Sequence, residues 1–216
     1  MFPRKVLMRK LLPAILCLVA AAWPVATPVS AEPISIMKLM APGPLPEMTL
    51  GEPAAPVTIV EYASMTCSHC GNFDKNTFDA LKTDYIDTGK AYYVFREFPL
   101  DQLAFAASMA ARCAPQDKYF PIIHTLFRNQ SAWAYVDNPA QALVAQLEPF
   151  GFTGDSFAAC LKKPDIATGI TTIAQTAQQE FGVNSTPSFF INGEKHAGEM
   201  DVAEVKAILD PLLAND

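Results

Sequence analysis

The spacing of hydrophobic and polar residues predicts a strand, a helix and a second strand after a Pro- and Gly-rich lead-in. Residues 57–63 form an apolar run rich in β-branched side chains, which is typical of a buried strand. From residue 68 to 87 the apolar positions recur every three or four residues, which indicates a helix that ends before Gly89. A second apolar run, at 91–98, predicts another strand. Two strands joined by a long helix indicate a βαβ unit with parallel strands and a right-handed crossover.

The pattern changes in the middle of the chain. Residues 100–164 are rich in Ala, Leu, Gln and Phe, and several prolines and glycines interrupt them. We expect short helices here that pack on one another, as a helical insertion rather than an independent domain. Another helix is predicted for 165–181, before Gly182.

The C-terminal part predicts a hairpin and a last helix. An apolar run at 186–191 meets Asn192-Gly193, which is a strong signal for a tight β-turn, and the chain continues into 194–196. Residues 201–213 carry apolar side chains at helical spacing. The order of these elements, with no internal repeat, indicates an α/β fold.

The first 31 residues have the pattern of a secretory signal peptide. Basic residues precede an apolar segment at 11–22, and Val29-Ser30-Ala31 supplies the small residues of a cleavage site before Glu32. Retention as a membrane anchor is the alternative, although prolines leave the apolar run too short for a typical span. Cleavage would place the mature chain in an oxidising compartment, where disulfides persist.

Composition and charge limit the classes of function. The whole chain has 16 basic and 22 acidic residues, and four of the basic ones lie in the predicted signal peptide, so the mature chain has a net charge of −10. That balance disfavours nucleic-acid binding. Residues 32–56 are expected to form an N-terminal arm, and 57–216 is long enough for one domain with a sizeable core.

The segment with the clearest chemistry is Cys67-Ser68-His69-Cys70, which joins the first predicted strand to the helix after it. Two thiols at this spacing can form a small-ring disulfide, and a helix N-terminus favours the thiolate of the first one. We therefore expect Cys67 to be the exposed nucleophile and Cys70 the shielded resolving thiol. A structural disulfide and half of a zinc site are the alternatives, but zinc needs two more ligands at a similar spacing.

Two titratable side chains near the cysteines are candidates for a role in the reaction. His69 lies between the thiols, where it can donate to the Cys67 thiolate or place positive charge near it; an exposed helical histidine is the alternative. Glu61 is an acid inside an apolar strand, and a buried carboxylate is costly unless it is paired or protonated. A solvent-facing position on an edge strand is the alternative for Glu61. His124 and His196 have no such context, and we interpret them as ordinary helix and hairpin residues.

Three blocks of sequence give the chain a likeness to a known family. The blocks are Glu61 to Cys70 (EYASMTCSHC), Phe95 to Leu100 (FREFPL) and Val183 to Phe189 (VNSTPSF). With them the chain resembles DsbA-type thiol–disulfide oxidoreductases of the bacterial periplasm. The resemblance implies a thioredoxin fold over residues 57–216 with an inserted α-helical subdomain at about 100–164. The family typically has Pro-His between the cysteines, where this chain has Ser-His, and this dipeptide tunes the redox poise.

The resemblance also implies roles for single residues. Pro187 is implied to be a cis-proline that faces the cysteines and leaves the backbone of Thr186 free for a substrate peptide; an ordinary trans turn is the alternative. Glu61 is implied to lie beneath the cysteine pair and to assist proton transfer at the resolving thiol, with Asp74 as a second acid near the site. The implied substrate-contacting residues are Ser68, Thr186 and Pro187.

Two further cysteines, Cys113 and Cys160, lie in the predicted insertion. In an oxidising compartment they are expected to form a second, structural disulfide, which would contribute a few kcal/mol to stability. Some relatives in the resembling family have such a bridge. Two buried free thiols are the alternative.

These observations predict an enzyme that donates its Cys67–Cys70 disulfide to newly exported proteins in the periplasm. By resemblance, a membrane partner of the DsbB type would reoxidise it. The predicted reaction involves no cofactor, no metal and no nucleic acid. The first alternative is a disulfide isomerase or reductase on the same fold, and the second is a redox-inert thioredoxin-like binding module.

Overall fold

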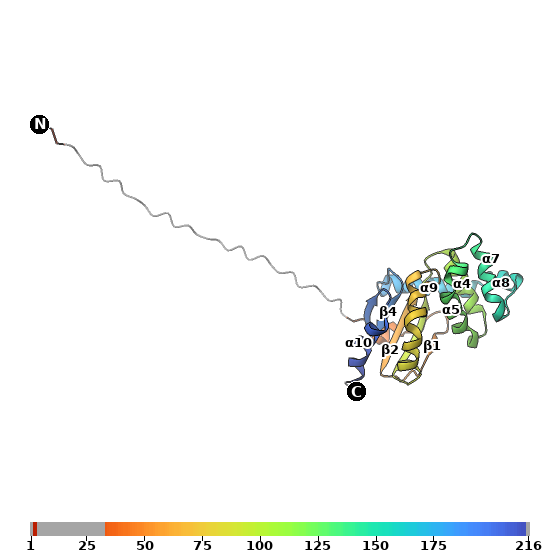
Figure 1. Cartoon of the computed structure of the whole chain (residues 1–216), viewed down its shortest axis with the longest axis horizontal. Helices are drawn as coiled ribbons and strands as arrows, with labels where there is room; N and C mark the ends of the chain where they lie inside the picture. The colour runs from red at the N-terminus through yellow and green to blue at the C-terminus, as the bar shows by residue number, and fades with distance from the viewer. Residues whose placement is uncertain (1, 4–32, 215–216) are drawn as a thin grey trace. The chain divides into compact units, whose positions relative to one another are not determined.

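The computed structural model describes residues 2–3 and 33–214, and Figure 1 shows how their elements are arranged. A five-stranded sheet with the strand order β1-β3-β2-β4-β5 runs through the folded part. The predicted signal peptide, 1–31, lies outside the described residues apart from Phe2 and Pro3. Within the described part of the chain, no helix has the length and apolar character needed to cross a membrane.

The predicted βαβ unit lies in the middle of the sheet. Strands β2 (Val57–Ala63) and β3 (Ala91–Glu97) are parallel along their whole length. One continuous helical run connects them, and two of its segments have the wider π-helical geometry. The segments of this run are α2 (Ser68–Phe73), η1 (Asp74–Phe78), α3 (Asp79–Leu81) and η2 (Lys82–Ile86).

The predicted hairpin forms the other side of the sheet. Strand β4 (Ser188–Ile191) is antiparallel to β2, and β5 (Glu194–Ala197) is antiparallel to β4. Between them Asn192 and Gly193 have positive φ angles of 48° and 89°. Two consecutive positive φ angles are what a type I′ hairpin turn requires, which explains why Asn-Gly occupies it.

The N-terminal arm contains two short elements that the hydrophobic pattern did not predict. Strand β1 (Met48–Leu50) pairs with β3 in antiparallel orientation and forms one edge of the sheet. Helix α1 (Ile36–Leu39) places Leu39 in a buried apolar cluster. Both elements are too short to show a hydrophobic period, so they are defined by pairing and packing with residues far along the chain.

Short helices make up the insertion, as predicted, and two further helices follow it. Figure 1 shows α4, α5, α7 and α8 gathered at one end of the folded part. A disulfide between Cys113 and Cys160 joins the C-terminal ends of α4 and α8. The helices are α4 (Gln102–Cys113), η3 (Gln116–Lys118), α5 (Tyr119–Arg128), α6 (Gln130–Trp133), α7 (Pro139–Leu147), η4 (Glu148–Phe150), α8 (Gly154–Cys160), α9 (Pro164–Glu180) and α10 (Val202–Leu213).

Helices cover both faces of the sheet. Ile59 and Tyr93 point to the face that packs against the α2–η2 run, the insertion and α10. Val60 and Phe190 point to the opposite face, where α9 and Phe181 cover them. Because both faces are covered, the central strands are apolar in almost every position, and any acid within them is buried.

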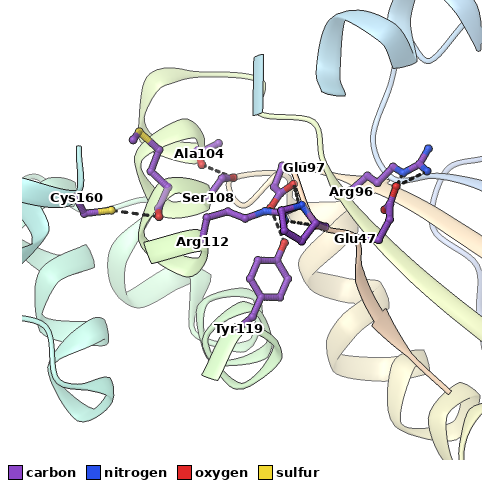
Figure 2. A network of polar contacts seen from close by, with 10 residues as sticks. Glu47, Arg96, Glu97, Ala104, Ser108, Arg112, Tyr119 and Cys160 are labelled. Carbon is purple, nitrogen blue, oxygen red and sulfur yellow. Dashed lines mark hydrogen bonds and ion pairs between the residues drawn. The ribbon is translucent and has the colours of Figure 1, made fainter. Parts of the chain in front are cut away.

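A buried polar network joins the end of β3 to the insertion and to the arm (Figure 2). Glu97 is fully buried and accepts hydrogen bonds from Arg112 of α4 and from the hydroxyl of Tyr119 of α5. The neighbouring Arg96 donates to Glu47 of the arm. Since a buried carboxylate is costly without partners, these contacts constrain how the helices of the insertion sit on the sheet.

Candidate active site

The two cysteines lie at the junction of β2 and α2. Cys67 is the N-cap residue of α2 and is half-buried, whereas Cys70 lies inside the first turn and is fully buried. Both are free thiols in this structure. A helix N-terminus presents backbone N–H groups that have no partner within the helix, so it attracts negative charge.

The environment of the pair pushes the two thiol pKa values apart. A hydrogen bond from Cys70 is the main reason that the pKa of Cys67 falls to about 5. The Thr186 side chain and the backbone N–H groups of Cys70 and His69 lower it further, against the opposing effect of burial. Burial is the main reason that the pKa of Cys70 is raised well above its usual value. Cys67 is therefore the thiolate at neutral pH, and Cys70 keeps its proton.

Thr186 and Pro187 lie against Cys67. The peptide bond between them is cis, and the Thr186 carbonyl accepts a hydrogen bond of 3.1 Å from the Cys67 thiol. The Thr186 side chain is almost fully buried. Because the peptide bond before Pro187 is cis, the ordinary trans turn that the sequence left as an alternative is wrong.

Glu61 lies in the middle of β2, paired with Phe95 on one side and Phe189 on the other. The edge-strand alternative for Glu61 is therefore wrong, because β2 is an inner strand. The hydroxyl of Tyr93 donates to its carboxyl group at 2.6 Å. Burial raises the pKa of Glu61 to about 8, and the Tyr93 hydrogen bond only partly offsets that effect. The negative charge of Glu61 also raises the pKa of Cys70, so the ionisation of one group affects that of the other.

His69 is exposed and contacts an acid that the sequence analysis did not identify. Its Nδ1 atom lies 2.7 Å from Glu199, in the segment after β5, and Asn72 donates to the same carboxylate oxygen. The hydrogen bond and the charge of Glu199 raise the pKa of His69. The imidazole is thus held by Glu199 rather than by a direct hydrogen bond to Cys67, although the Cys67 charge still acts on it.

Asp74 is buried in the same helical run as the cysteines. Its carboxylate contacts Nδ1 of His124 and, at 2.9 Å, Nε of Arg128. His124 is therefore more than an ordinary helix residue, because it pairs with this buried acid. The charge of Asp74 contributes to the raised pKa of Glu61. Asp74 thus affects the site by favouring the protonated form of Glu61.

Several exposed side chains lie in or near the segments that flank Cys67. Ser68 is exposed at the first position of α2. Leu100 and Tyr135 are large apolar side chains with more than half of their surface exposed, at 56% and 58%. The hydroxyl of Tyr135 donates to the carbonyl of Thr66, which places this ring beside the loop before Cys67. The sequence analysis did not single out Leu100 or Tyr135, because no local pattern relates them to the cysteines.

Metal ligands do not gather at the site. Across the residues that the structure describes, no three His, Cys, Asp or Glu side chains lie together in a way that suits a metal ion. Cys113 and Cys160 are bonded to each other in the insertion, and neither takes part in the site around Cys67.

Comparisons with known proteins agree with this geometry. A family model described as thioredoxin matches residues 45–211. A Rickettsia conorii protein named as a candidate protein-disulfide oxidoreductase is 32% identical over 171 residues, which cover 77% of this chain and 60% of that protein. The chain thus spans only about three fifths of that relative's length.

Solved structures give the same picture. The alpha-DsbA1 structure from Wolbachia pipientis has a TM-score of 0.75 and 32% identity, and the match covers 82% of this chain and 96% of that one. The oxidised BdbD structure from Bacillus subtilis has a TM-score of 0.69 at 20% identity and covers 86% of this chain and 98% of that one, which shows a shared fold.

Proposed function

This chain belongs to the thioredoxin superfamily as a DsbA-like thiol–disulfide oxidoreductase, and we propose that it acts as an oxidase that donates its Cys67–Cys70 disulfide to newly exported proteins. The observation that supports this direction is the low pKa of Cys67, about 5. A stabilised thiolate stabilises the reduced enzyme, so the disulfide form is the stronger oxidant. Each unit of pKa decrease corresponds to about 1.4 kcal/mol, or roughly 30 mV for a two-electron couple.

The proposed reaction has two exchange steps. A substrate thiolate attacks the Cys67 sulfur of the disulfide, a mixed disulfide forms, and the Cys70 sulfur leaves and takes up a proton. A second substrate thiolate then attacks the substrate sulfur of the mixed disulfide, and Cys67 leaves as its stabilised thiolate. The substrate loses two electrons and gains a disulfide, and the enzyme gains both electrons as its reduced pair.

Glu61 is the proposed proton donor and acceptor for Cys70. Its pKa of about 8 lies near neutral pH, where a group exchanges protons most effectively in both directions. Buried Cys70 leaves poorly as a bare thiolate because burial raises its pKa. A proton supplied from beneath the pair would therefore speed the first exchange step.

Thr186, Pro187 and Ser68 are the proposed contacts for the substrate chain. The Thr186 carbonyl oxygen lies 3.1 Å from the Cys67 sulfur and accepts the thiol hydrogen only while Cys67 is protonated. In the disulfide form and in the thiolate form this hydrogen is absent, so the carbonyl is free to accept from a substrate N–H group. That arrangement would place an extended substrate peptide beside the reactive sulfur.

Export and reoxidation complete the proposal. The signal-peptide pattern of residues 1–31 supports export to the periplasm, and the oxidising setting supports a role in disulfide formation. Each turnover leaves the enzyme reduced, so an electron acceptor must restore its disulfide. We propose a membrane partner of the DsbB type for that step.

The test combines trapping with a redox measurement. The Cys70→Ala variant, converted to its mixed disulfide with glutathione and mixed with an unfolded secreted protein that keeps a single cysteine, should accumulate a covalent complex through Cys67, since neither Cys70 nor a second substrate thiol remains to resolve it. Cys67→Ala is the matched control and should form none. The reduction potential, measured against glutathione, should lie well above that of thioredoxin, about −270 mV. A thioredoxin-like potential together with efficient rescue of mispaired disulfides would contradict the oxidase assignment and favour the isomerase.

A further inference from the structure

Gln130 reaches the cysteine loop from the helical insertion. It is the first residue of α6 and is buried, with 7% of its surface exposed. Its side-chain nitrogen donates to the carbonyl oxygens of Met65 and Cys67, each at 2.9 Å. An amide NH₂ group has two hydrogens, so both of its donors are used on this loop.

The other end of the Gln130 amide is fitted against Gly71. A Cβ atom placed on Gly71 would overlap Oε1 of Gln130. Gly71 lies directly after Cys70, inside the first turn of α2. The Gln130 side chain is therefore held between the loop before the helix and the helix itself, and it fits only because residue 71 has no side chain.

Three consecutive carbonyls of this loop accept hydrogen bonds from the insertion. Gln130 binds those of Met65 and Cys67, and the hydroxyl of Tyr135 binds that of Thr66 between them at 2.7 Å. A buried carbonyl without a partner would cost about 1–3 kcal/mol, so the loop has a strong reason to keep this conformation. The insertion thereby sets the backbone direction at Cys67.

The backbone conformation of Cys67 determines whether its sulfur can receive hydrogen bonds from the first N–H groups of α2. Cys67 is an N-cap residue in extended conformation, with φ of −77° and ψ of 119°, and no side chain caps the helix there. The N–H groups of His69 and Cys70 act on the Cys67 sulfur only while this N-cap geometry persists. The Cys67 carbonyl that Gln130 holds also accepts from the N–H of Gly71, at 3.1 Å.

We propose that Gln130 is a positioning residue for thiol–disulfide exchange, which fixes the Cys67 backbone at the start of α2 and so couples the helical insertion to the reactivity of Cys67. The proposal rests on the proposed function in one respect, namely that Cys67 is the attacking thiol. It assigns the insertion a role in tuning the cysteine pair.

The test removes the N–H donors of the Gln130 side chain and keeps a side chain of similar size. Gln130→Met has nearly the same length and no N–H group. Gln146→Met is the matched control, because the side chain of half-buried Gln146 in α7 accepts a hydrogen bond from Asn129 and has no other hydrogen bond among the described residues. The thiolate of Cys67 is titrated by its ultraviolet absorbance. We expect the midpoint to rise by about one pKa unit in Gln130→Met, and the equilibrium constant with glutathione to shift about tenfold toward the oxidised enzyme. Gln146→Met should leave both values unchanged.

A purely structural role predicts a different result. It would lower the stability of the oxidised and reduced forms equally and would leave the Cys67 midpoint and the glutathione equilibrium at their wild-type values. That outcome in folded Gln130→Met overturns the proposal. Should this variant not fold, Gly71→Ala decides instead, since alanine favours the helix while its methyl group displaces Gln130. An unchanged midpoint in Gly71→Ala would likewise overturn it.

The two proposals fail in different ways. If wild-type Cys67 titrates near 9, the activated thiolate is absent and the proposed function fails. If wild-type Cys67 titrates near 5 and the Gln130 and Gly71 variants do too, the proposed function stands and the positioning role of Gln130 is wrong.

Discussion

Cys67 and Cys70 are one helical turn apart, yet their surroundings shift their pKa values in opposite directions. The half-buried sulfur of Cys67 receives hydrogen bonds, and its pKa falls to about 5. The sulfur of Cys70 is fully buried, and burial, together with the charges of Cys67 and Glu61, raises its pKa. One thiol is thereby prepared to attack or leave as an anion, and the other to carry a proton. At this scale the chemistry depends on burial and on hydrogen-bond donors, and residue type alone does not set it.

Replacing Glu61 with Gln should change how stability depends on pH. The pKa of Glu61 is raised from 4.5 to about 8 in the folded protein, so between these values the unfolded chain releases the proton first and the native state becomes less stable as pH rises. Glu61→Gln removes that loss, and its stability relative to wild type should grow between pH 4.5 and 8 by on the order of a few kcal/mol.

Denaturant unfolding of the reduced protein across this pH range measures the effect. Exposed Glu52 supplies the control, since Glu52→Gln should follow the wild-type pH dependence. A Glu61→Gln curve parallel to wild type would show that the carboxyl group titrates normally. Such a result would also remove it as the proton donor for Cys70.

At the scale of elements, the candidate active site is assembled from three separate parts of the chain. The β2–α2 junction supplies the cysteines, the segment before β4 supplies Thr186 and Pro187, and the insertion supplies Gln130. Arg112 holds the insertion to the sheet through the buried Glu97 at the end of β3. Packing between elements therefore decides whether these groups meet.

Breaking the Arg112–Glu97 pair should be costly. Arg112→Met leaves the fully buried Glu97 carboxylate without its charged partner, and the free energy of unfolding should fall by about 3–5 kcal/mol. Lys82→Met breaks an exposed pair with Asp87 and should cost less than about 1 kcal/mol. Denaturant unfolding compares the two variants, and similar losses would contradict a special role for the buried pair.

For the whole molecule, the arm and the second disulfide extend the fold beyond the βαβ unit and the hairpin. The arm adds β1 to the sheet and Leu39 to the apolar cluster under α9. The disulfide closes a loop of 47 residues within the insertion. Such a closure restricts the unfolded chain and thereby favours the native state.

Removing the second disulfide should reduce stability and leave the active site intact. The double variant Cys113→Ala/Cys160→Ala should lose about 2–4 kcal/mol of unfolding free energy, because the unfolded chain regains loop freedom. The thiolate titration of Cys67 should match wild type, since neither cysteine contacts the site. A shifted titration would mean that the disulfide also shapes the cysteine loop.

Local sequence determined much of this fold. The hydrophobic periods of residues 57–98 predicted the parallel strand pair and its connecting helix, and Asn192-Gly193 predicted the hairpin turn. The strand pattern before Cys67 and the helical pattern after it predicted that the thiols lie at a strand–helix junction. These features were readable because strand and helix periods, turn conformations and N-cap positions depend on residues close together in the chain.

The tertiary structure alone decided the surroundings of the cysteines. Glu199 reaches His69 across 130 residues of sequence, and Gln130 reaches the Cys67 carbonyl across 63. The sequence identified Glu61 as an acid in an apolar strand, but its pKa of about 8 arises from burial between β3 and β4. Contacts and burial of this kind depend on how distant segments pack, and no local pattern records that. The sequence therefore identified the two thiols that we expect to react, and the fold shifts their pKa values in opposite directions.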